Sequence, residues 1–133
     1  LAVNNNNQKL NYDLTINSIQ SPSVVLFNTE ISGAAANNKL DLNIFLRDRQ
    51  RRDKYVIAGI FQSINKDFRF NLDPNKLLLD YEKWTVSPEN YIQFGQSGIV
   101  ANQFNLSQGT HLLSINSINN TPNSPLRVEF KEF

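Results

Sequence analysis

The chain has 133 residues, a formal net charge of +1, no cysteine and a single histidine, His111. This length corresponds to one domain of ordinary size, which buries roughly two-thirds of its unfolded surface and needs no disulfide or metal to fold. The composition excludes a disulfide framework, a thiol nucleophile and any site needing two histidines, and it argues against nucleic-acid binding driven by net charge.

Two features of the composition concern the origin of the chain. The sequence contains no methionine, and asparagine is its commonest residue. Asparagine tolerates left-handed backbone and bonds its own loop, so this abundance predicts many turns. No apolar run approaches the roughly 20 residues of a membrane span. We expect a mature product or an excised domain of a bacterial protein that is secreted, exposed at the cell surface or facing the periplasm.

The N-terminal third predicts two strands separated by polar segments. Residues 1–8 include four consecutive asparagines with little to bury, and they predict a flexible arm ahead of a single domain over residues 9–133. Residues 9–17 alternate between apolar and polar side chains, which is typical of a strand with one buried face. Residues 24–27 predict a second strand, and the small, polar run 28–38 predicts a loop.

The stretch from residue 39 to residue 64 predicts the central hairpin of the domain. Residues 39–47 alternate strictly, with Leu42 and Ile44 among the apolar positions. A charged run follows and predicts a solvated turn. Residues 55–61 are apolar on both faces, as in a strand at the middle of a sheet with a second layer above it.

The rest of the chain predicts further short strands. Residues 77–81 suit either a strand or one helical turn, and Ser87-Pro88-Glu89 has the form of a helix start that extends for one turn at most. Strands are expected at residues 67–72, 92–94, 99–106, 111–118 and 126–133. Many short strands with frequent turn signals predict an all-β, two-layer antiparallel β-sandwich, loosely immunoglobulin-like.

The turn of the central hairpin forms a candidate charged surface patch. Two acidic residues, Asp48 and Asp53, are interleaved with its basic residues. Such a patch could grip an acidic partner or a phosphate, but interleaving favours a solvated tip that also discourages edge-to-edge pairing. The basic residues are Arg47, Arg49, Arg51, Arg52 and Lys54.

Three aromatic residues, Tyr81, Trp84 and Tyr91, lie in a polar and poorly periodic stretch. Flat rings beside carboxylates could stack on sugars, which makes these residues candidate ligand-binding positions. The alternative interpretation, which we favour for Trp84, is that the sole tryptophan anchors the core of a small sandwich.

No catalytic constellation is present. The sequence has no nucleophile elbow, calcium loop or phosphate-binding glycine loop, and its alternating strands place carboxylates on solvated faces. We therefore expect no catalytic residues, no metal ligands and no cofactor, and we interpret the chain as a non-enzyme.

The order of several short motifs resembles the TANFOR-type β domain of very large bacterial surface proteins. The resemblance covers residues 21–115 and implies an exported structural module without assigned functional residues. The motifs are Ser21-Pro22-Ser23-Val24-Val25-Leu26, Asn38-Lys39-Leu40, Asn90-Tyr91 before Phe94-Gly95, and the turn at Gly109.

These observations favour a non-catalytic structural or adhesion module of a bacterial surface or secreted assembly, with protein partners. One alternative is a carbohydrate-binding module that takes a polysaccharide through its aromatic residues. The other is a pilus or secretion-system subunit that exchanges a terminal strand with a neighbour.

Overall fold

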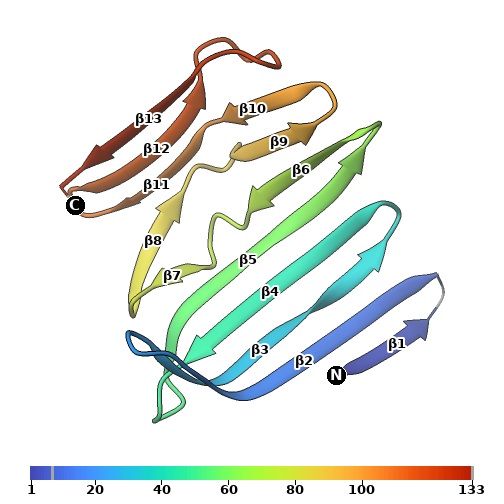
Figure 1. Cartoon of the computed structure of the whole chain (residues 1–133), viewed down its shortest axis with the longest axis vertical. Helices are drawn as coiled ribbons and strands as arrows, with labels where there is room; N and C mark the ends of the chain where they lie inside the picture. Colours follow the sequence, from blue (N-terminus) through green and yellow to red (C-terminus); the bar gives the residue numbers. More distant parts are fainter. Residues whose placement is uncertain (7, 133) are drawn as a thin grey trace.

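The computed structural model describes residues 1–6 and 8–132, and all of its regular elements are β-strands. Hydrogen bonds join them into one open antiparallel sheet of thirteen strands, so the all-β antiparallel prediction is confirmed (Figure 1). The strand pairing itself defines no separate second layer. The described residues include no helix long and apolar enough to cross a membrane.

The strands are β1 (Ala2–Asn6), β2 (Lys9–Gln20), β3 (Val25–Ala36), β4 (Lys39–Arg47), β5 (Asp53–Ile64), β6 (Asp67–Leu72), β7 (Leu77–Leu79), β8 (Glu82–Val86), β9 (Tyr91–Gly95), β10 (Gly98–Asn102), β11 (Phe104–Gln108), β12 (His111–Ser117) and β13 (Leu126–Lys131).

The chain runs back and forth across the sheet from one edge to the other. Strands β1 to β5 pair in sequence, and β6 and β7 then both pair with β5, end to end along the same edge. The next two positions in the sheet are each also shared by two short strands that lie end to end, and we call each such position a divided row. Strands β8 and β9 form one of these rows and β10 and β11 the other, and β12 and β13 then complete the sheet. Strands β1 and β13 therefore form the two open edges, on opposite sides of the molecule (Figure 1).

Asparagine residues occupy several of the tight turns, as the abundance of asparagine predicts. Asn37 and Asn38 connect β3 to β4 with φ angles of 51° and 62°. Two consecutive residues with positive φ form the tight turn that matches the twist of paired strands, and asparagine adopts this conformation readily. Asn65, with φ of 56°, occupies the turn between β5 and β6 in the same way.

The N-terminal segment differs from the expected flexible arm. Ala2–Asn6 forms β1 and pairs with β2, with Val3 opposite Tyr12. An edge strand is held by backbone hydrogen bonds, which do not require apolar side chains, so an asparagine-rich segment can join the sheet. Asn7 lies outside the described residues.

The predicted loop at residues 28–38 is also wrong, because Val25–Ala36 forms the long strand β3. The small residues of this segment have a packing role. Tyr12 on β2 reaches across Gly33 and donates a hydrogen bond from its hydroxyl to the backbone carbonyl of Asp41 on β4. A Cβ atom at residue 33 would overlap this carbonyl, so the crossing requires glycine.

The expected helical turn at residues 87–89 is absent, and a tight turn ending at Asn90 separates β8 from β9. The side chain of Asn90 is fully buried (0% exposed) and bonds both backbone groups of Leu72 at the end of β6. Its amide also donates to the carbonyl of Ser87. One side chain therefore replaces the backbone pairing that is lost where these rows are interrupted.

The buried core lies in the same interrupted region. Its members come from β6, β7, β8 and β11, and partly buried residues of β5, β9 and β12 pack around them. The buried members are Leu72, Leu77, Val86, Phe104 and Leu106.

Candidate functional site

One face of the sheet is apolar from edge to edge. Residues directly opposite each other in an antiparallel pair point to the same face, so the register assigns each strand's side chains. We call this surface the apolar face. Its residues include Val3 of β1, Leu10 and Leu14 of β2, Ile31 of β3, Leu42 and Ile44 of β4, Ile57 and Phe61 of β5, Phe68 and Leu72 of β6, Leu77 of β7, Trp84 of β8, Phe94 of β9, Ile99 of β10, Leu106 of β11, Leu113 and Ile115 of β12, and Val128 and Phe130 of β13.

Much of the apolar face is open to solvent. None of the apolar residues that β2 and β4 contribute is buried, and β13 is exposed throughout. The accessible surface of the chain is 8708 Å². A compact monomer of 15.2 kDa exposes roughly 7,100 Å². The excess, roughly 1,600 Å², is about twice the roughly 800 Å² that each partner contributes to a standard interface, and it indicates a surface that is suited to a partner or ligand.

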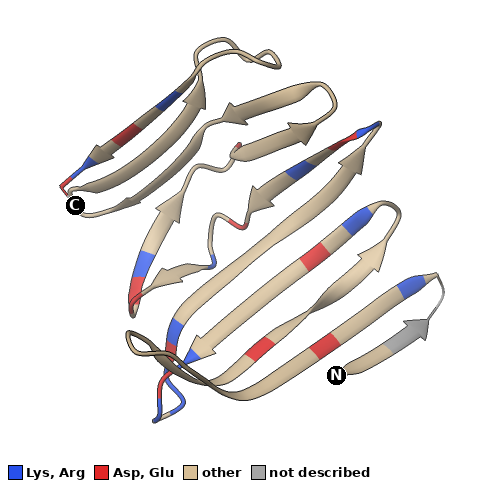
Figure 2. Ribbon diagram, in the orientation of Figure 1, with Lys and Arg blue, Asp and Glu red and all other residues tan. Residues whose placement is uncertain are grey.

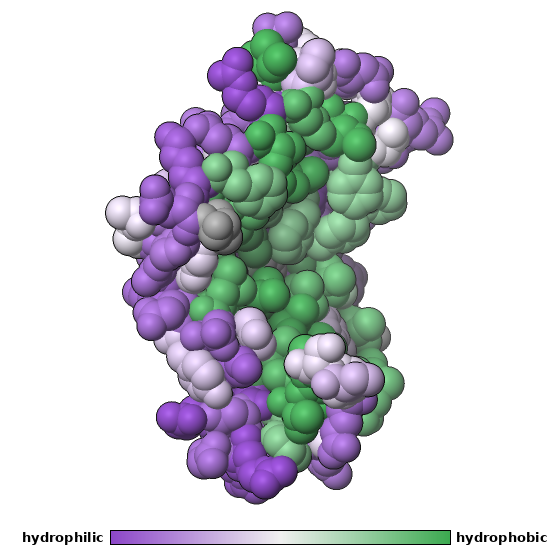
Figure 3. Space-filling view, turned by 60° about the vertical axis from the view of Figure 1, so that its left-hand side comes forward, coloured by the Kyte–Doolittle hydropathy of each residue, from purple (hydrophilic) through white to green (hydrophobic). Residues whose placement is uncertain are grey.

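Apolar side chains gather in a stripe along the long axis of the molecule, flanked by hydrophilic residues and hollowed along part of its length (Figure 3). One hollow on this face has a volume of about 370 Å³ and is lined in part by Leu40, Phe61 and Phe68. Phe61 and Phe68 stack with their ring centroids 5.4 Å apart, and Phe94 lies 6.1 Å from both. Phe68 and Phe94 remain 42% and 39% exposed, so the rings present a bare aromatic surface beside the hollow.

The opposite face carries charged and polar residues together with some apolar ones, among them Phe45, Val56 and Ile60. Figure 2 shows charged residues spread along several strands with a concentration at the tip of the β4–β5 hairpin. A second hollow of about 540 Å³ lies where β6 ends, between residues of β4 and β5. Its lining includes Asp41, Asn43 and Asp73, and Asp73 forms an ion pair with Lys76 at 3.7 Å. Among the described residues, no group of three or more His, Cys, Asp or Glu side chains could hold a metal ion.

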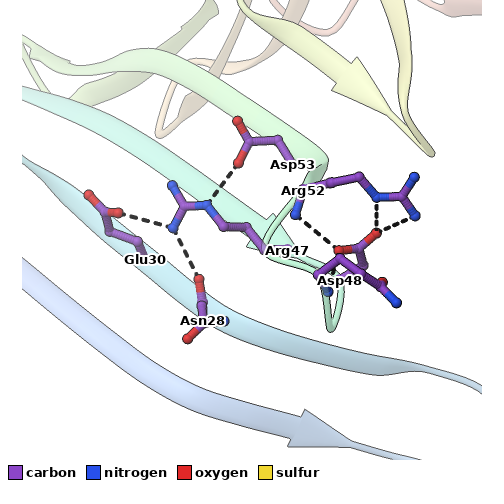
Figure 4. Close-up of polar contacts among 7 residues, drawn as sticks. Asn28, Glu30, Arg47, Asp48, Arg52 and Asp53 are labelled. Carbon is purple, nitrogen blue, oxygen red and sulfur yellow. Dashed lines mark hydrogen bonds and ion pairs between the residues drawn. The ribbon is translucent and has the colours of Figure 1, made fainter.

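The charged hairpin tip is organised around Asp48 (Figure 4). Its carboxylate accepts hydrogen bonds from the backbone N–H groups of Gln50 and Arg52, at 2.9 and 3.0 Å. The guanidinium of Arg52 lies 2.8 Å away, and the Tyr81 hydroxyl donates at 2.9 Å. Burial raises the pKa of Asp48, but the hydrogen bonds from Arg52 and Tyr81 and the Arg52 charge outweigh it and hold that pKa below its usual value.

Most of the predicted basic patch is engaged within the chain. Arg47 lies 2.8 Å from Asp53 and 3.3 Å from Glu30 of β3 (Figure 4). Lys54 lies 3.5 Å from Asp80. The guanidinium of Arg49 lies over the ring of Phe27, and Arg51 is exposed in a turn with φ of 64°. The interleaved arrangement favours a structural role for the patch, as its sequence indicates.

The three predicted aromatic residues lie at separate places. Tyr81 sits in the β7–β8 turn and reaches the hairpin tip. Trp84 is half-buried on the apolar face, beside the core and 6.5 Å from the His111 ring. Tyr91 alternates with apolar Ile92 and so faces the polar side, where Arg69 lies 4.1 Å above its ring. The structure does not bring the three rings onto one surface, and sugar binding by them stays a prediction.

No protein-family profile, no curated protein and no solved structure matches this chain. The TANFOR-type resemblance therefore stays a prediction, and the functional argument depends on the geometry of the chain itself.

Sequence reasoning missed the cluster of Phe61, Phe68 and Phe94 as a surface feature. The alternation of residues 67–72 correctly places Phe68 and Leu72 on one face, but Leu72 is 7% exposed and Phe68 is 42% exposed. A period of two shows which side chains share a face, whereas it does not show whether anything covers that face. The one signal of this exposure in the sequence was the number of strands with an apolar side, which is large for a chain of this size.

Proposed function

We propose that this chain is a non-catalytic module of a bacterial cell-surface or secreted assembly, and that its apolar face binds the hydrocarbon chains of lipids. The single observation that carries the proposal is a continuous apolar face, much of it open to solvent and hollowed along part of its length (Figure 3).

The dimensions of the face suit a long, thin apolar ligand. Ten strands form the path from β1 to β13, and a spacing of about 4.8 Å gives this path a length of roughly 43 Å. The face reaches both open edges without a charged residue among its central strand positions in β4, β5 and β6. A hydrocarbon chain lying across the strands would contact apolar side chains along its whole length.

The energetics favour such a ligand. Removing each methylene group from water contributes roughly 0.8 kcal/mol, and a half-open face recovers a fraction of this for every carbon that it covers. A lipid head group can remain in solvent, because the face is open over β2 and β4 and at β13. The proposal requires no acid–base residue, metal or cofactor.

Trp84 makes the proposal directly testable, because it is the sole tryptophan and lies on the apolar face. Fatty acids brominated along the chain should quench its fluorescence with a saturable dependence on concentration. Phe68→Glu places a charge beside the hollow and should weaken this binding at least ten-fold. Gln62→Glu adds the same charge next to Phe61 but on the polar face, so it should leave binding unchanged.

Two outcomes would contradict the proposal. The first is the absence of quenching at concentrations that saturate other lipid-binding proteins. The second is equal weakening by Phe68→Glu and Gln62→Glu, which would indicate a non-specific effect of charge.

The cellular setting is the less direct part of the proposal. Its support is the asparagine-rich, cysteine-free composition of the chain. Fractionation of the producing bacterium, with detection by an antibody against the folded domain, tests this assignment. Recovery in the cytosolic fraction would contradict it.

A further inference from the structure

We infer that two copies of this chain join edge to edge through β13, so that their sheets form one continuous sheet around a twofold axis. This inference deepens the proposed function, on which it rests, because pairing would extend the apolar face that binds hydrocarbon chains.

Among the described residues, β13 pairs only with β12, and its other edge has no neighbouring strand. Such an edge presents unpaired N–H and C=O groups that a further strand can satisfy. The apolar-face residues of β13 are highly exposed to solvent, with exposed fractions of 42% for Leu126, 52% for Val128 and 63% for Phe130. A strand added here would cover the flanks of these side chains as well as the backbone groups.

The sequence of β13 is complementary to itself in one antiparallel register. With Val128 on the twofold axis, it faces Val128 of the second copy, and Leu126 faces Phe130. On the polar face, Arg127 then lies opposite Glu129, and the symmetry makes this contact twice. Opposite charges at directly facing positions stabilise a strand pair.

The neighbouring registers are unfavourable. Moving the axis to Glu129 places that carboxylate against its own copy and Arg127 against Lys131. Moving it to Arg127 places two guanidinium groups together, and like charges directly opposite are destabilising. Registers shifted by one residue would turn the apolar face of the second copy to the opposite side of the sheet, and they do not have this twofold symmetry. Of these three registers, the charges of β13 favour the one centred on Val128.

The facing residues of β12 do not neutralise the charges of Arg127 and Glu129. Within the chain, Arg127 lies opposite Asn116 and Glu129 opposite Ser114 on β12, neither of which is charged. Glu129 has Lys131 of its own strand at 3.2 Å, in an exposed pair that contributes little. A twofold axis perpendicular to the sheet also keeps both apolar faces on the same side, and twofold dimers are the commonest symmetric assemblies.

The chain contains no cysteine, so single-cysteine variants give an unambiguous test. Val128→Cys should form a disulfide-linked dimer on mild oxidation, because the two Val128 positions face each other at a distance a disulfide can span. Arg127→Cys should not crosslink alone, but it should crosslink when mixed with Glu129→Cys. Crosslinking of Val128→Cys only with Val3→Cys would instead show a head-to-tail contact with β1 and overturn the inference.

Charge reversal gives an independent measurement by sedimentation. Arg127→Glu and Glu129→Arg each bring like charges together, and each should self-associate at least ten-fold more weakly than the wild-type protein. An equimolar mixture should recover association, because both facing pairs in the mixed dimer have opposite signs. A wild-type protein that stays monomeric at high concentration would overturn the inference. If brominated chains still quench Trp84 in that monomer, the dimer fails while the proposed function stands.

Discussion

The two parts of the sheet use the same alternation of residues for different purposes. Strands β2 to β5 are long and uninterrupted, and the apolar residues of β2 and β4 are at most half-buried. Rows β6–β7, β8–β9 and β10–β11 are each divided, and these rows supply the core. The interrupted region therefore carries most of the apolar burial, and the long strands carry much of the open surface.

The interruptions offer a physical reason for this difference. A strand that ends and restarts can change direction, as it does at a bulge, which lets neighbouring rows pack their apolar side chains together. Uninterrupted strands of up to 12 residues keep their side chains spread along the sheet. The interrupted rows of the apolar face therefore contribute most to stability, and the long strands supply the open surface to which the proposed ligand would bind.

Loss of the Asn90 side chain should be the most damaging change to the interrupted region. Asn90→Ala removes the side-chain hydrogen bonds to both backbone groups of Leu72 and one of the two hydrogen bonds that the Ser87 carbonyl accepts from Asn90. We expect a loss of roughly 3–5 kcal/mol in the free energy of unfolding, measured in urea. Asn17→Ala, at an exposed strand position, should cost no more than about 0.5 kcal/mol. Similar losses in the two variants would refute the role of Asn90.

Two leucines that flank the same residue allow a direct comparison of the two regions. Leu72 of β6 and Leu42 of β4 lie on opposite sides of Gly59, but only Leu72 is buried. Leu72→Ala should cost roughly 2–4 kcal/mol because it leaves a cavity. Leu42→Ala should cost about 1 kcal/mol, since its side chain is already partly hydrated. An equal cost would mean that the long strands are covered in solution.

The Asp48 cluster predicts how stability depends on acid. The folded-state pKa of Asp48 is lowered, so its contribution is present above the unfolded pKa of about 3.9 and is lost as the pH falls through the folded value. Asp48→Asn should therefore be less stable at neutral pH and lose less stability than the wild-type protein on acidification. Thermal melts between about pH 6 and pH 2 measure this difference. The same slope in Asp48→Asn as in the wild-type protein would contradict this role of Asp48.

Loss of a single hydroxyl at the hairpin tip should have the smallest effect. Tyr81→Phe removes the bond to Asp48 but keeps the ring between Arg52 and Lys54. We expect a loss of about 1 kcal/mol or less, because the contact is partly solvated. A loss above that of Leu72→Ala would show that the tip, rather than the core, limits stability.

The sequence predicted strands best where polar and apolar residues alternate strictly. Residues 39–47 match β4 and residues 67–72 match β6, because each presents one consistently apolar side. The sequence did not predict β1 or the part of β3 beyond residue 27, because asparagine, glycine and alanine are typical of loops and the pairing of these segments depends on neighbouring strands.

The candidate site was harder to predict than the strands. The expectation for Trp84 came from its being the sole tryptophan, and the residue lies half-buried beside the core. Local pattern placed Phe68 on the apolar side. It gave no reason to expect Phe68, Phe61 and Phe94 to form an exposed cluster, since β5, β6 and β9 meet only through the sheet topology. Exposure is a property of the whole fold and cannot be read from one strand.

The central claim, that the apolar face of the sheet takes up hydrocarbon chains, is tested most directly by varying chain length alone. Saturated fatty acids of increasing length, each held below its micelle concentration, should be titrated while the emission of Trp84 is followed. The account predicts that affinity rises with every added methylene, by at most about four-fold each, until the chain exceeds the length of the face. An affinity that is independent of chain length would contradict the account, because it would place the binding energy in the head group.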